Sequence, residues 1–237
     1  MTIGVDIGGS KIRGILWNGK KIVRSFEIKT PKSLEKFKST LKLLFKNLNA
    51  SGSVKKIGIS IAGVVSSTKV ISTSNIPYLK NYNLKSLISN FQPLTSVVVD
   101  NDARCFARAE YELVAAKGAK SVLFITLGTG IGRAYGKNNK ILKIKQFEKA
   151  ESWEKDYQKI KNKKELAEFL GEKLSLITDA LNPEVVVIGG GVIKKKGYFE
   201  AIKNQLSNQV AKYEIRRSKL GKFAGAIGGA MLWKNNH

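Results

Sequence analysis

The sequence predicts an α/β protein built from two domains. Apolar, strand-like runs alternate with helical patterns along the whole chain of 237 residues. Each half begins with the same unit of strand, glycine-rich turn and second strand: "TIGVDIGGSKIRGIL" in the first half and "SVLFITLGTGIGRAYG" in the second. A hydrophobic share of 43% and 22 glycines fit a globular chain with a sizeable core. The repeated unit favours two domains around a cleft.

The first half contains most of the strand signals. Apolar or alternating runs predict strands at 2–8, 11–19, 20–29, 55–65 and 94–101. Residues 33–48 place Leu34, Phe37, Leu41, Leu44 and Phe45 at helical spacing. A short helix is expected at 86–91. A longer helix is expected at 103–119, opened by the Asn101-Asp102 pair and closed by Gly118.

The second half repeats this alternation. A strand, a glycine loop and a strand are expected at 121–138, and a strand with a glycine loop at 183–192. Helices are expected at 164–181, at 197–210 and from residue 225 onward. In the first of these, Leu166, Leu170, Leu174 and Ile177 fall on one face. Residues 137–164 are polar, lysine-rich and weakly periodic, so no element is predicted there.

Composition limits the function classes. The net charge of +24 attracts nucleotides, nucleic acids and anionic membranes, but a generally lysine-rich composition explains it without a polyanion partner. Proteins that read bases rely on arginine, which is scarce here. A single cysteine, Cys105, and a single histidine, His237, exclude an internal disulfide and a Cys/His zinc site. No signal peptide or membrane-length apolar run is evident, which predicts a cytoplasmic protein without membrane partners.

Three glycine-rich turns follow apolar strands: "DIGGSK" (6–11), "LGTGIG" (127–132) and "IGGGV" (188–192). Glycine lacks Cβ, so backbone N–H groups at such turns can approach a phosphate closely. None of the turns matches the P-loop pattern or a dinucleotide fingerprint. One such turn is weak evidence, whereas three at strand ends indicate phosphate binding. Asp6 adds a carboxylate that could hold Mg²⁺, although a turn-capping aspartate is the alternative.

Seven segments occur in an order that resembles a known family: "VDIGGSKIRGIL", "IGISIAGVV", "STSNIPYL", "VVVDNDARCFARAE", "LGTGIG", "NPEVVVIGGGV" and "GAIGGAM". Together they resemble the sugar kinases of the repressor/ORF/kinase (ROK) family, within the actin-like ATPase and hexokinase superfamily. The resemblance covers nearly the whole chain except about 137–165. It implies two ribonuclease-H-like domains, 1–101 with 225–237 and 102–224, with ATP and a sugar in the cleft between them.

The resemblance gives Asp102 the role of catalytic base, which accepts the proton of the sugar hydroxyl that attacks the γ-phosphate of ATP. Asn101 is expected to bind neighbouring sugar hydroxyls, and Gly63 and Asn75 resemble sugar-contacting positions. Asp100 receives no chemical role. The alternative for the Asn101-Asp102 pair is helix N-capping, for Gly63 the end of a strand, and for Asn75 a turn.

The nucleotide would be held by residues at the three glycine turns. Asp6 would lie on the Mg²⁺ side, directly or through water. The cofactor-binding residues expected from the resemblance are Asp6, Gly8, Gly9, Ser10, Lys11, Gly128, Thr129, Gly130, Gly189, Gly190 and Gly191. Lys11 has a solvated surface lysine as its alternative.

The family pattern is broken at 145–160. Many ROK members carry a Glu-x-Gly-His motif and a cysteine-rich zinc motif, and this chain has neither, so no structural zinc is expected. Ser152, Trp153, Glu154 and Tyr157 resemble the end of that region in zinc-free members, which makes Glu154 the sugar-binding glutamate. The upstream glutamate is either Glu148 or Glu151, and a solvated helix explains both equally well. Arg133 stands where small residues are common.

The expected function is therefore an ATP-dependent kinase of a hexose or N-acylhexosamine, similar to glucokinase, and a homo-oligomer (dimer). The alternative is a non-enzymatic ROK-like regulator or nucleic-acid binder, which only the +24 charge supports. ROK repressors add an N-terminal helix-turn-helix, whereas here the first strand is expected from residue 2. A third reading is an actin-fold kinase for a small molecule that is not a sugar.

Overall fold

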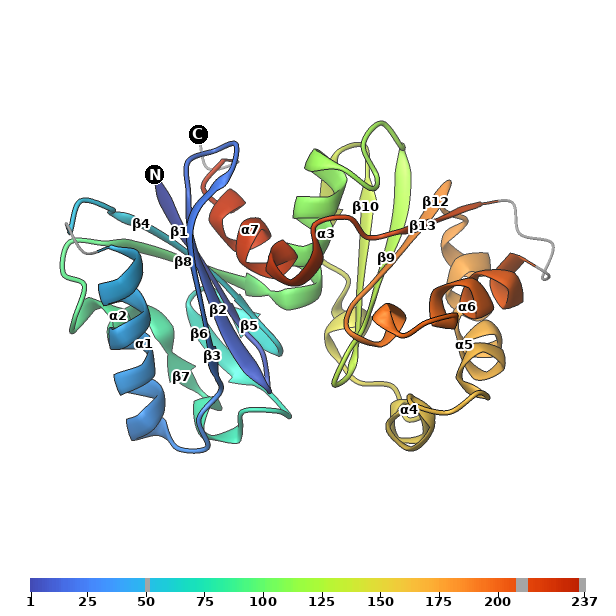
Figure 1. Cartoon of the computed structure of the whole chain (residues 1–237), viewed down its shortest axis with the longest axis horizontal. Coiled ribbons are helices and arrows are strands. Elements are labelled where there is room, and N and C mark those ends of the chain that lie inside the picture. Colours follow the sequence, from blue (N-terminus) through green and yellow to red (C-terminus); the bar gives the residue numbers. More distant parts are fainter. Residues whose placement is uncertain (50–51, 208–212, 235–237) are drawn as a thin grey trace. The chain divides into compact units, whose positions relative to one another are not determined.

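The computed structural model describes residues 1–49, 52–207 and 213–234. The chain divides into two compact units (Figure 1). The first comprises residues 1–109 with the C-terminal segment from 223, and the second comprises residues 110–222. The division lies within helix α3 (Asp102–Leu113), eight residues beyond the expected boundary at 101, because α3 runs on from one unit into the next.

The first unit is built on a five-stranded sheet of order β3-β2-β1-β4-β8. Its central strands β1 (Thr2–Ile7) and β4 (Lys56–Ile61) and its edge strand β8 (Ser96–Asn101) run parallel. Strands β2 (Lys11–Trp17) and β3 (Ile22–Lys29) pair antiparallel with β1 and with each other. The parallel strands therefore present their carboxyl ends at one edge of the sheet.

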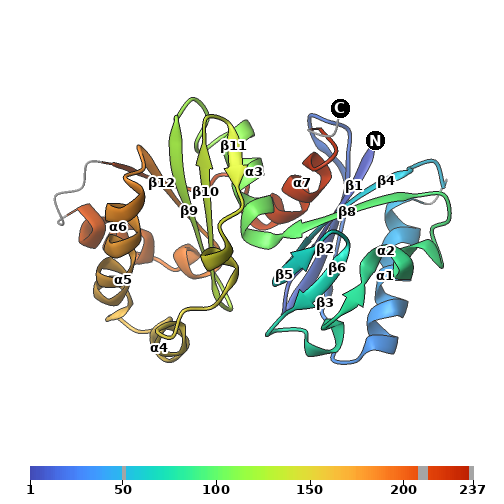
Figure 2. The same ribbon diagram turned by 180° about the vertical axis from the view of Figure 1, so that it is seen from behind.

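Helices cover both faces of this sheet (Figures 1 and 2). On one face, α1 (Leu34–Leu48) packs near Gly14, where a Cβ would lie 2.6 Å from Leu48 Cδ1. On the other face, α7 (Ala224–Met231) packs so closely that a Cβ on Gly4 would lie 1.9 Å from the carbonyl oxygen of Ala226. Because Gly4 has no side chain, α7 can pack directly against β1. Helix α7 therefore belongs to the first unit, although it follows the second unit in the sequence.

Smaller elements complete the first unit. They are the three-stranded sheet β5 (Val64–Ser66), β6 (Lys69–Ser72) and β7 (Tyr82–Asn83), a 3₁₀ turn η1 (Pro77–Leu79) and helix α2 (Leu84–Ser89). The core behind them is apolar and closely packed. It includes the helix α1 residues predicted from spacing, of which Phe37, Leu41, Leu44 and Phe45 are buried.

The second unit repeats the strand order and directions of the first. Its sheet has the order β11-β10-β9-β12-β13, with β9 (Ser121–Leu127), β12 (Val185–Gly189) and β13 (Glu214–Arg217) parallel. Strands β10 (Ile131–Lys137) and β11 (Lys140–Leu142) are antiparallel. Helices α5 (Leu166–Leu181) and α6 (Tyr198–Ser207) cover one face of the sheet (Figure 2).

Most of the predicted elements are confirmed. Each unit has its own five-stranded sheet, as a two-domain α/β protein requires. The helix expected at 197–210 is found as α6, while 208–210 lie outside the described residues. The segment 137–164, which had no predicted element, contains β11, a 3₁₀ turn η2 (Lys145–Glu148) and the short helix α4 (Glu154–Ile160).

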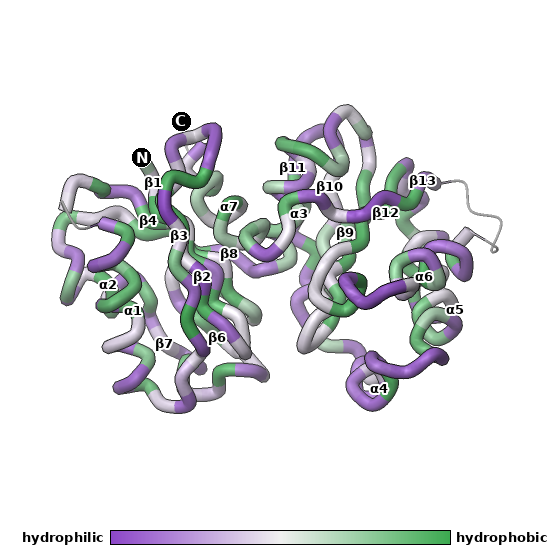
Figure 3. The backbone as a smooth tube through the Cα atoms, in the orientation of Figure 1, coloured by the Kyte–Doolittle hydropathy of each residue, from purple (hydrophilic) through white to green (hydrophobic). Residues whose placement is uncertain are grey.

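Two further 3₁₀ turns, η3 (Val192–Lys194) and η4 (Gly221–Phe223), lead into α6 and α7. Figure 3 shows α4 as largely hydrophilic, which explains why its sequence gave only weak periodicity. None of the helices in residues 1–49, 52–207 and 213–234 combines the length and apolar character needed to cross a membrane.

Candidate active site

Polar residues gather at the carboxyl ends of the three parallel strands of the first unit. Asp6 of β1 lies opposite Ser60 of β4, and Ser60 lies opposite Asp100 of β8. Asn101 ends β8, and Asp102 begins α3. In open α/β sheets this edge is where ligands bind, because loops and helix N-termini meet there. The sheet thus brings the predicted metal-side carboxylate and the predicted base to the same edge.

Asp6 is partly buried and has few protein partners. Ser60 donates a hydrogen bond from Oγ to Asp6 Oδ1 at 2.7 Å, and Arg13 Nη1 lies 3.8 Å from Oδ2. Burial raises the pKa of Asp6, while the Ser60 hydrogen bond and the Arg13 charge lower it by less. The backbone of Gly225 passes so close that a Cβ there would lie 2.7 Å from Oδ1. A buried carboxylate with so little compensation favours a cation.

Asn101 has a structural role at the start of α3. Its Oδ1 accepts hydrogen bonds from the backbone N–H of Ala103 at 3.0 Å and of Arg104 at 3.3 Å, so it caps α3. Its Nδ2 donates to the carbonyl of Gly63 at 3.0 Å. The capping interpretation therefore holds for Asn101, and the same bonds connect it to Gly63.

Asp102 occupies the first turn of α3 and is partly buried. Its Oδ1 accepts the Ala103 N–H at 2.9 Å. Burial and, after it, the negative charge of Asp6 raise the pKa of Asp102 to about 6, while backbone hydrogen bonds and the charge of Arg104 act in the opposite direction. A carboxylate with a pKa near 6 is ionised at neutral pH yet more basic than an exposed aspartate. Asp102 is thus suited to accept a proton.

The first glycine turn is a tight hairpin between β1 and β2. The Gly8 N–H bonds the Lys11 carbonyl at 3.0 Å, and the Thr30 hydroxyl donates to the Gly8 carbonyl at 2.6 Å. A Cβ on Gly9 would lie 2.6 Å from Cβ of Asn75, so this turn and the predicted sugar-contacting Asn75 are in contact. The ammonium of Lys11 is paired with Glu27 at 2.6 Å.

The Glu27 carboxylate holds two cations of this hairpin. Besides Lys11, it accepts Nε of Arg13 at 2.7 Å, and hydrogen bonds from both lower the pKa of Glu27 to about 2. Neither the sequence spacing nor the turn itself indicated this pairing, because it depends on the β2–β3 register, in which Arg13 lies opposite Glu27.

Gly63 requires glycine for two reasons. Its φ is +157°, and a Cβ would lie 2.3 Å from the carbonyl oxygen of Ser72. The neighbouring Thr73 is buried, and its hydroxyl has no hydrogen-bond partner in the described part of the chain. An unpaired buried hydroxyl is costly, so Thr73 is a polar group beside Gly63 that sequence reasoning missed.

The other two glycine turns meet at the carboxyl ends of β9 and β12 in the second unit. Gly189 lies opposite Thr126, and a Cβ on Gly190 would lie 2.2 Å from the Leu127 carbonyl oxygen. Gly190 has φ +101°, so it is required on conformational grounds too. The Gly128 N–H bonds the Gly130 carbonyl at 3.0 Å, which closes the turn around Thr129. Around Gly130 and Gly191 the space for a Cβ is open.

Helix α4 holds the turn of Gly128 and Thr129 from one side. The Tyr157 hydroxyl donates to the Gly128 carbonyl at 3.0 Å, and Nε2 of Gln158 donates to the Thr129 carbonyl. The same helix begins at Glu154, the predicted sugar-binding glutamate, which is only 11% exposed. The segment that was least readable in the sequence therefore connects Glu154 to the second glycine turn.

Glu154 is paired with Arg133 of β10. Nη2 of Arg133 donates to Glu154 Oε1 at 2.7 Å, and the same oxygen accepts the Glu151 N–H at 3.0 Å. The Arg133 side chain is 1% exposed and also donates to the Lys149 carbonyl at 2.8 Å. Of the two upstream candidates, Glu151 lies 3.7 Å from Arg133 Nη1. Glu148 lies in η2.

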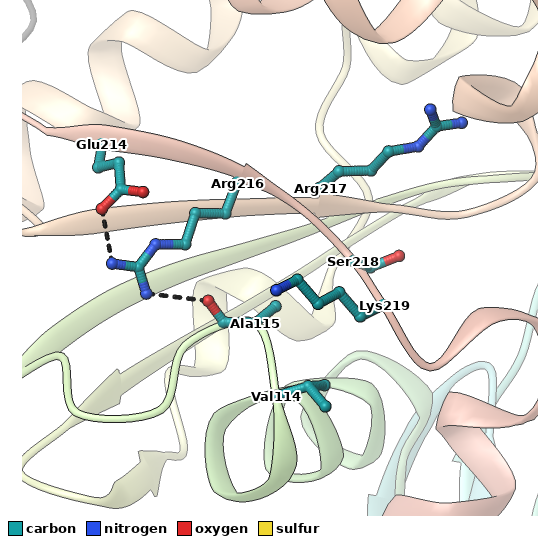
Figure 4. A pocket seen from close by; sticks show the side chains of 7 residues that line it. All are labelled: Val114, Ala115, Glu214, Arg216, Arg217, Ser218 and Lys219. Carbon is teal, nitrogen blue, oxygen red and sulfur yellow. Dashed lines mark hydrogen bonds and ion pairs between the residues drawn. The ribbon is translucent and has the colours of Figure 1, made fainter.

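A pocket of about 510 Å³ lies along the edge strand β13 of the second unit (Figure 4). It is rich in basic side chains, but its two guanidinium groups have protein partners. Arg216 donates to Glu214 at 2.6 Å and to the Ala115 carbonyl at 3.0 Å, and Arg217 donates to the Ile193 carbonyl at 2.7 Å. These bonds are typical of a charged sheet edge that resists pairing with other strands.

Two units of the same strand order, each with glycine turns or carboxylates at the carboxyl ends of its parallel strands, define the class of actin-like ATPase folds. The ROK family model matches residues 2–146 and 133–236. The chain therefore belongs to the ROK family, as the ordered motifs predicted.

Among the relatives of this chain are sugar kinases. The glucokinase of Streptomyces coelicolor is 33% identical over 144 residues, which are 60% of this chain and 45% of that protein. The chain thus aligns with less than half the length of that relative.

Solved structures match over nearly the whole chain. A ROK family glucokinase from Streptomyces griseus, in complex with glucose and AMPPNP, has a TM-score of 0.83 at 22% identity and covers 98% of both chains. The inorganic polyphosphate/ATP-glucomannokinase from Arthrobacter sp. strain KM has a TM-score of 0.78 at 26% identity, covering 100% of this chain and 99% of that one.

Proposed function

We propose that this chain is an ATP-dependent sugar kinase that transfers the γ-phosphoryl group of ATP to a hydroxyl of a hexose or N-acylhexosamine. The observation that carries the proposal is the carboxylate of Asp102, which lies at the first turn of α3 with a pKa of about 6 and at the same sheet edge as Asp6. The similarity to glucokinases supports the substrate class.

Asp102 serves as the general base in this proposal. Its carboxylate takes the proton from the sugar hydroxyl while the hydroxyl oxygen forms a bond to the γ-phosphorus. The bond between that phosphorus and the bridging oxygen of the β-phosphate breaks, and ADP leaves with the electron pair. Phosphoryl transfer depends mainly on positioning and charge stabilisation, so a weak base suffices.

The sugar is held by Gly63, Asn75, Asn101 and Glu154. The side chain of Asn101 already forms hydrogen bonds with the N-terminus of α3 and with Gly63. Its main contribution to the sugar site is therefore to hold Gly63 and the start of α3 in place. Glu154 engages one oxygen, Oε1, with Arg133 and the Glu151 N–H, which leaves Oε2 for a sugar hydroxyl.

The residues at Asp6 fit a magnesium ion. Asp6 is partly buried, its pKa is raised by burial, and Arg13 is its nearest cation at 3.8 Å. No cluster of three or more metal-binding side chains occurs in residues 1–49, 52–207 and 213–234. This suits Mg²⁺, which is usually held by one or two carboxylates with water and substrate phosphates. Bound there, it would neutralise the charge that develops on the phosphates.

The nucleotide phosphates are assigned to the backbone N–H groups of the glycine turns, and no structural zinc is part of the proposal. The turns at 8–11, 128–130 and 189–191 offer such groups where side chains are absent. We further propose a homodimer, which sedimentation at several protein concentrations would test.

A coupled ADP-release assay over hexoses and N-acylhexosamines tests the activity. The donors should include ATP and inorganic polyphosphate, because the name of the Arthrobacter relative contains both. Turnover of at least one sugar is expected, with loss of turnover in Asp102→Asn. Absence of turnover with every sugar and both donors would rule the proposal out and favour a regulator without enzymatic activity.

A further inference from the structure

A second pocket, of about 360 Å³, lies within the first unit, beside the edge strand β8. Residues from four places in the sequence line it: the β5–β6 turn, β8, helix α3 and the residue that follows α7. They are Ser67, Thr68, Val97, Val98, Val99, Asp100, Arg108 and Leu232. β8 is the edge strand of its sheet, and among the described residues its backbone pairs with β4 on one side, which leaves the backbone groups of its other edge unpaired with a strand. The pocket combines three valines of this strand with a polar end.

The polar end holds one carboxylate between two guanidinium groups. Asp100 lies between two guanidinium groups of α3: Arg104 Nη2 is 2.5 Å and Nε 2.7 Å from Oδ1, and Arg108 Nη2 is 3.2 Å from Oδ2. Oδ1 also accepts the Asn101 N–H at 2.8 Å. Both carboxylate oxygens are thus engaged, and the two guanidinium groups share this one carboxylate.

Arg108 carries one donor, Nη1, that makes no hydrogen bond within the described part of the chain. The Arg108 side chain is only 14% exposed, and Nη1 itself is buried. A buried, unpaired charged donor is costly, since it has lost water without gaining a protein acceptor. Arg216 and Arg217 of the β13 pocket differ in this respect, because neither has a buried nitrogen without a hydrogen bond among the described residues.

We propose that this pocket binds a small molecule through an oxyanion, a carboxylate or a phosphate group, which accepts a hydrogen bond from Nη1 of Arg108. An anion matches the unused donor of Arg108, a guanidinium group that shares its carboxylate with Arg104. The hydroxyl of Thr68, which also bonds Asn83 Oδ1 at 3.2 Å, and that of Ser67 lie at the same pocket and suit further oxyanion oxygens. Val97, Val98 and Val99 would contact the apolar part of the ligand.

The test is binding of two simple probes, inorganic phosphate and acetate, at matched ionic strength. Melting temperature is measured for the wild type, Arg108→Gln and the control Arg24→Gln, each with AMPPNP and glucose present in excess. Arg24 is exposed and donates to the Asn47 carbonyl. Arg24→Gln is therefore the same chemical change as Arg108→Gln, made outside the pocket. Any phosphate that binds at the glycine turns affects all three proteins alike.

A saturable rise in melting temperature is expected for the wild type and Arg24→Gln with at least one probe. In Arg108→Gln the apparent affinity should fall about 10-fold or more, as for a lost hydrogen bond to a charged group. A response to phosphate alone identifies a phosphate ester as the ligand class, and a response to acetate a carboxylate. An equal response in all three proteins, or none in the wild type, would overturn the proposal.

A second measurement uses the wild-type protein alone, so it does not depend on whether a variant folds. The guanidinium resonances of the 7 arginines are followed by ¹⁵N NMR in the wild type during titration with each probe. The Arg108 resonance should shift saturably, and that of Arg24 should stay in place. If Arg108 does not move with either probe, the site does not bind oxyanions. Neither measurement depends on kinase activity, so the proposed function and this site can fail separately.

Discussion

Arg133 and Glu154, 21 positions apart in the sequence, form a buried ion pair with 2.7 Å between Nη2 and Oε1. Their side chains are 1% and 11% exposed. The pair fastens the start of α4 to strand β10 and fixes the orientation of the carboxylate that we assign to the sugar. Arg133 Nε and Nη1 have no hydrogen-bond partner in the described residues, although Nη1 lies 3.7 Å from Glu151.

Breaking this pair should destabilise the second unit. Arg133→Met leaves Glu154 buried without its cation, which typically costs about 3–5 kcal/mol. Urea unfolding measures this loss, and the double variant Arg133→Met with Glu154→Met should recover much of it, since no uncompensated charge remains. An unfolding free energy of Arg133→Met equal to that of the wild type would show that the pair contributes no net stability.

Much of the fold was predictable because its signals are local. The strands are apolar runs that end in glycine, and the face of α1 repeats with helical spacing. The Asn101-Asp102 motif predicted both a helix start and a base. Its position at the end of β8 follows from the run of valines before it.

The side-chain pairs were less predictable because they depend on tertiary contacts. Lys11 pairs with Glu27 only through the β2–β3 register, and Arg133 meets Glu154 across the segment without periodicity. One pairing did have a local signal. Arg104 and Arg108 are one turn apart on α3 and therefore share a face, and Asp100, two residues before the helix, meets them there.

Two adjacent glycines of the third turn should respond differently to alanine. In Gly190→Ala the new Cβ would lie 2.2 Å from the Leu127 carbonyl oxygen at φ +101°, so the backbone must move. A cost of about 1–3 kcal/mol or more is expected from the strain alone. In the control Gly191→Ala the Cβ meets no atom within 4 Å. Thermal unfolding checks this, and equal melting temperatures would contradict the packing described for Gly190.

Asp102 should make the protein less stable as pH rises. Its pKa is about 6 in the folded protein against its ordinary value of 3.8, so the folded state holds the proton more tightly. The stability that the protonated Asp102 contributes is therefore fully present below about pH 4 and is lost as pH rises through 6. Asp102→Asn removes this penalty and should be more stable than the wild type at pH 7.5, by at most about 3 kcal/mol, with little difference at pH 4. Melting temperatures at both pH values decide, and a variant less stable at pH 7.5 would contradict the raised pKa.

Asp6 should be coupled to the titration of Asp102. The charge of Asp6 is the second cause of the raised pKa after burial, so Asp6→Asn should lower the pKa of Asp102. The carboxyl ¹³C resonance of Asp102 reports its titration directly and needs no activity from the variant. Glu35→Gln, at an exposed residue of α1 in the same unit that pairs with Lys38, is the control and should leave the titration in place. An unchanged midpoint in Asp6→Asn would mean that the two carboxylates do not interact.

Asp102→Asn gives the decisive test of the base. Asparagine preserves the shape and the acceptor for the Ala103 N–H but cannot take a proton. Turnover should fall by roughly 10²–10⁴-fold, as for a lost general base, while sugar affinity changes far less. Asp100→Asn is the matched control two residues away. It should reduce stability, because Arg104 and Arg108 lose their carboxylate, yet leave the turnover of the folded protein nearly unchanged. Reversed effects of the two substitutions, measured as kcat and melting temperature side by side, would remove Asp102 from the chemistry and leave it as part of the helix start.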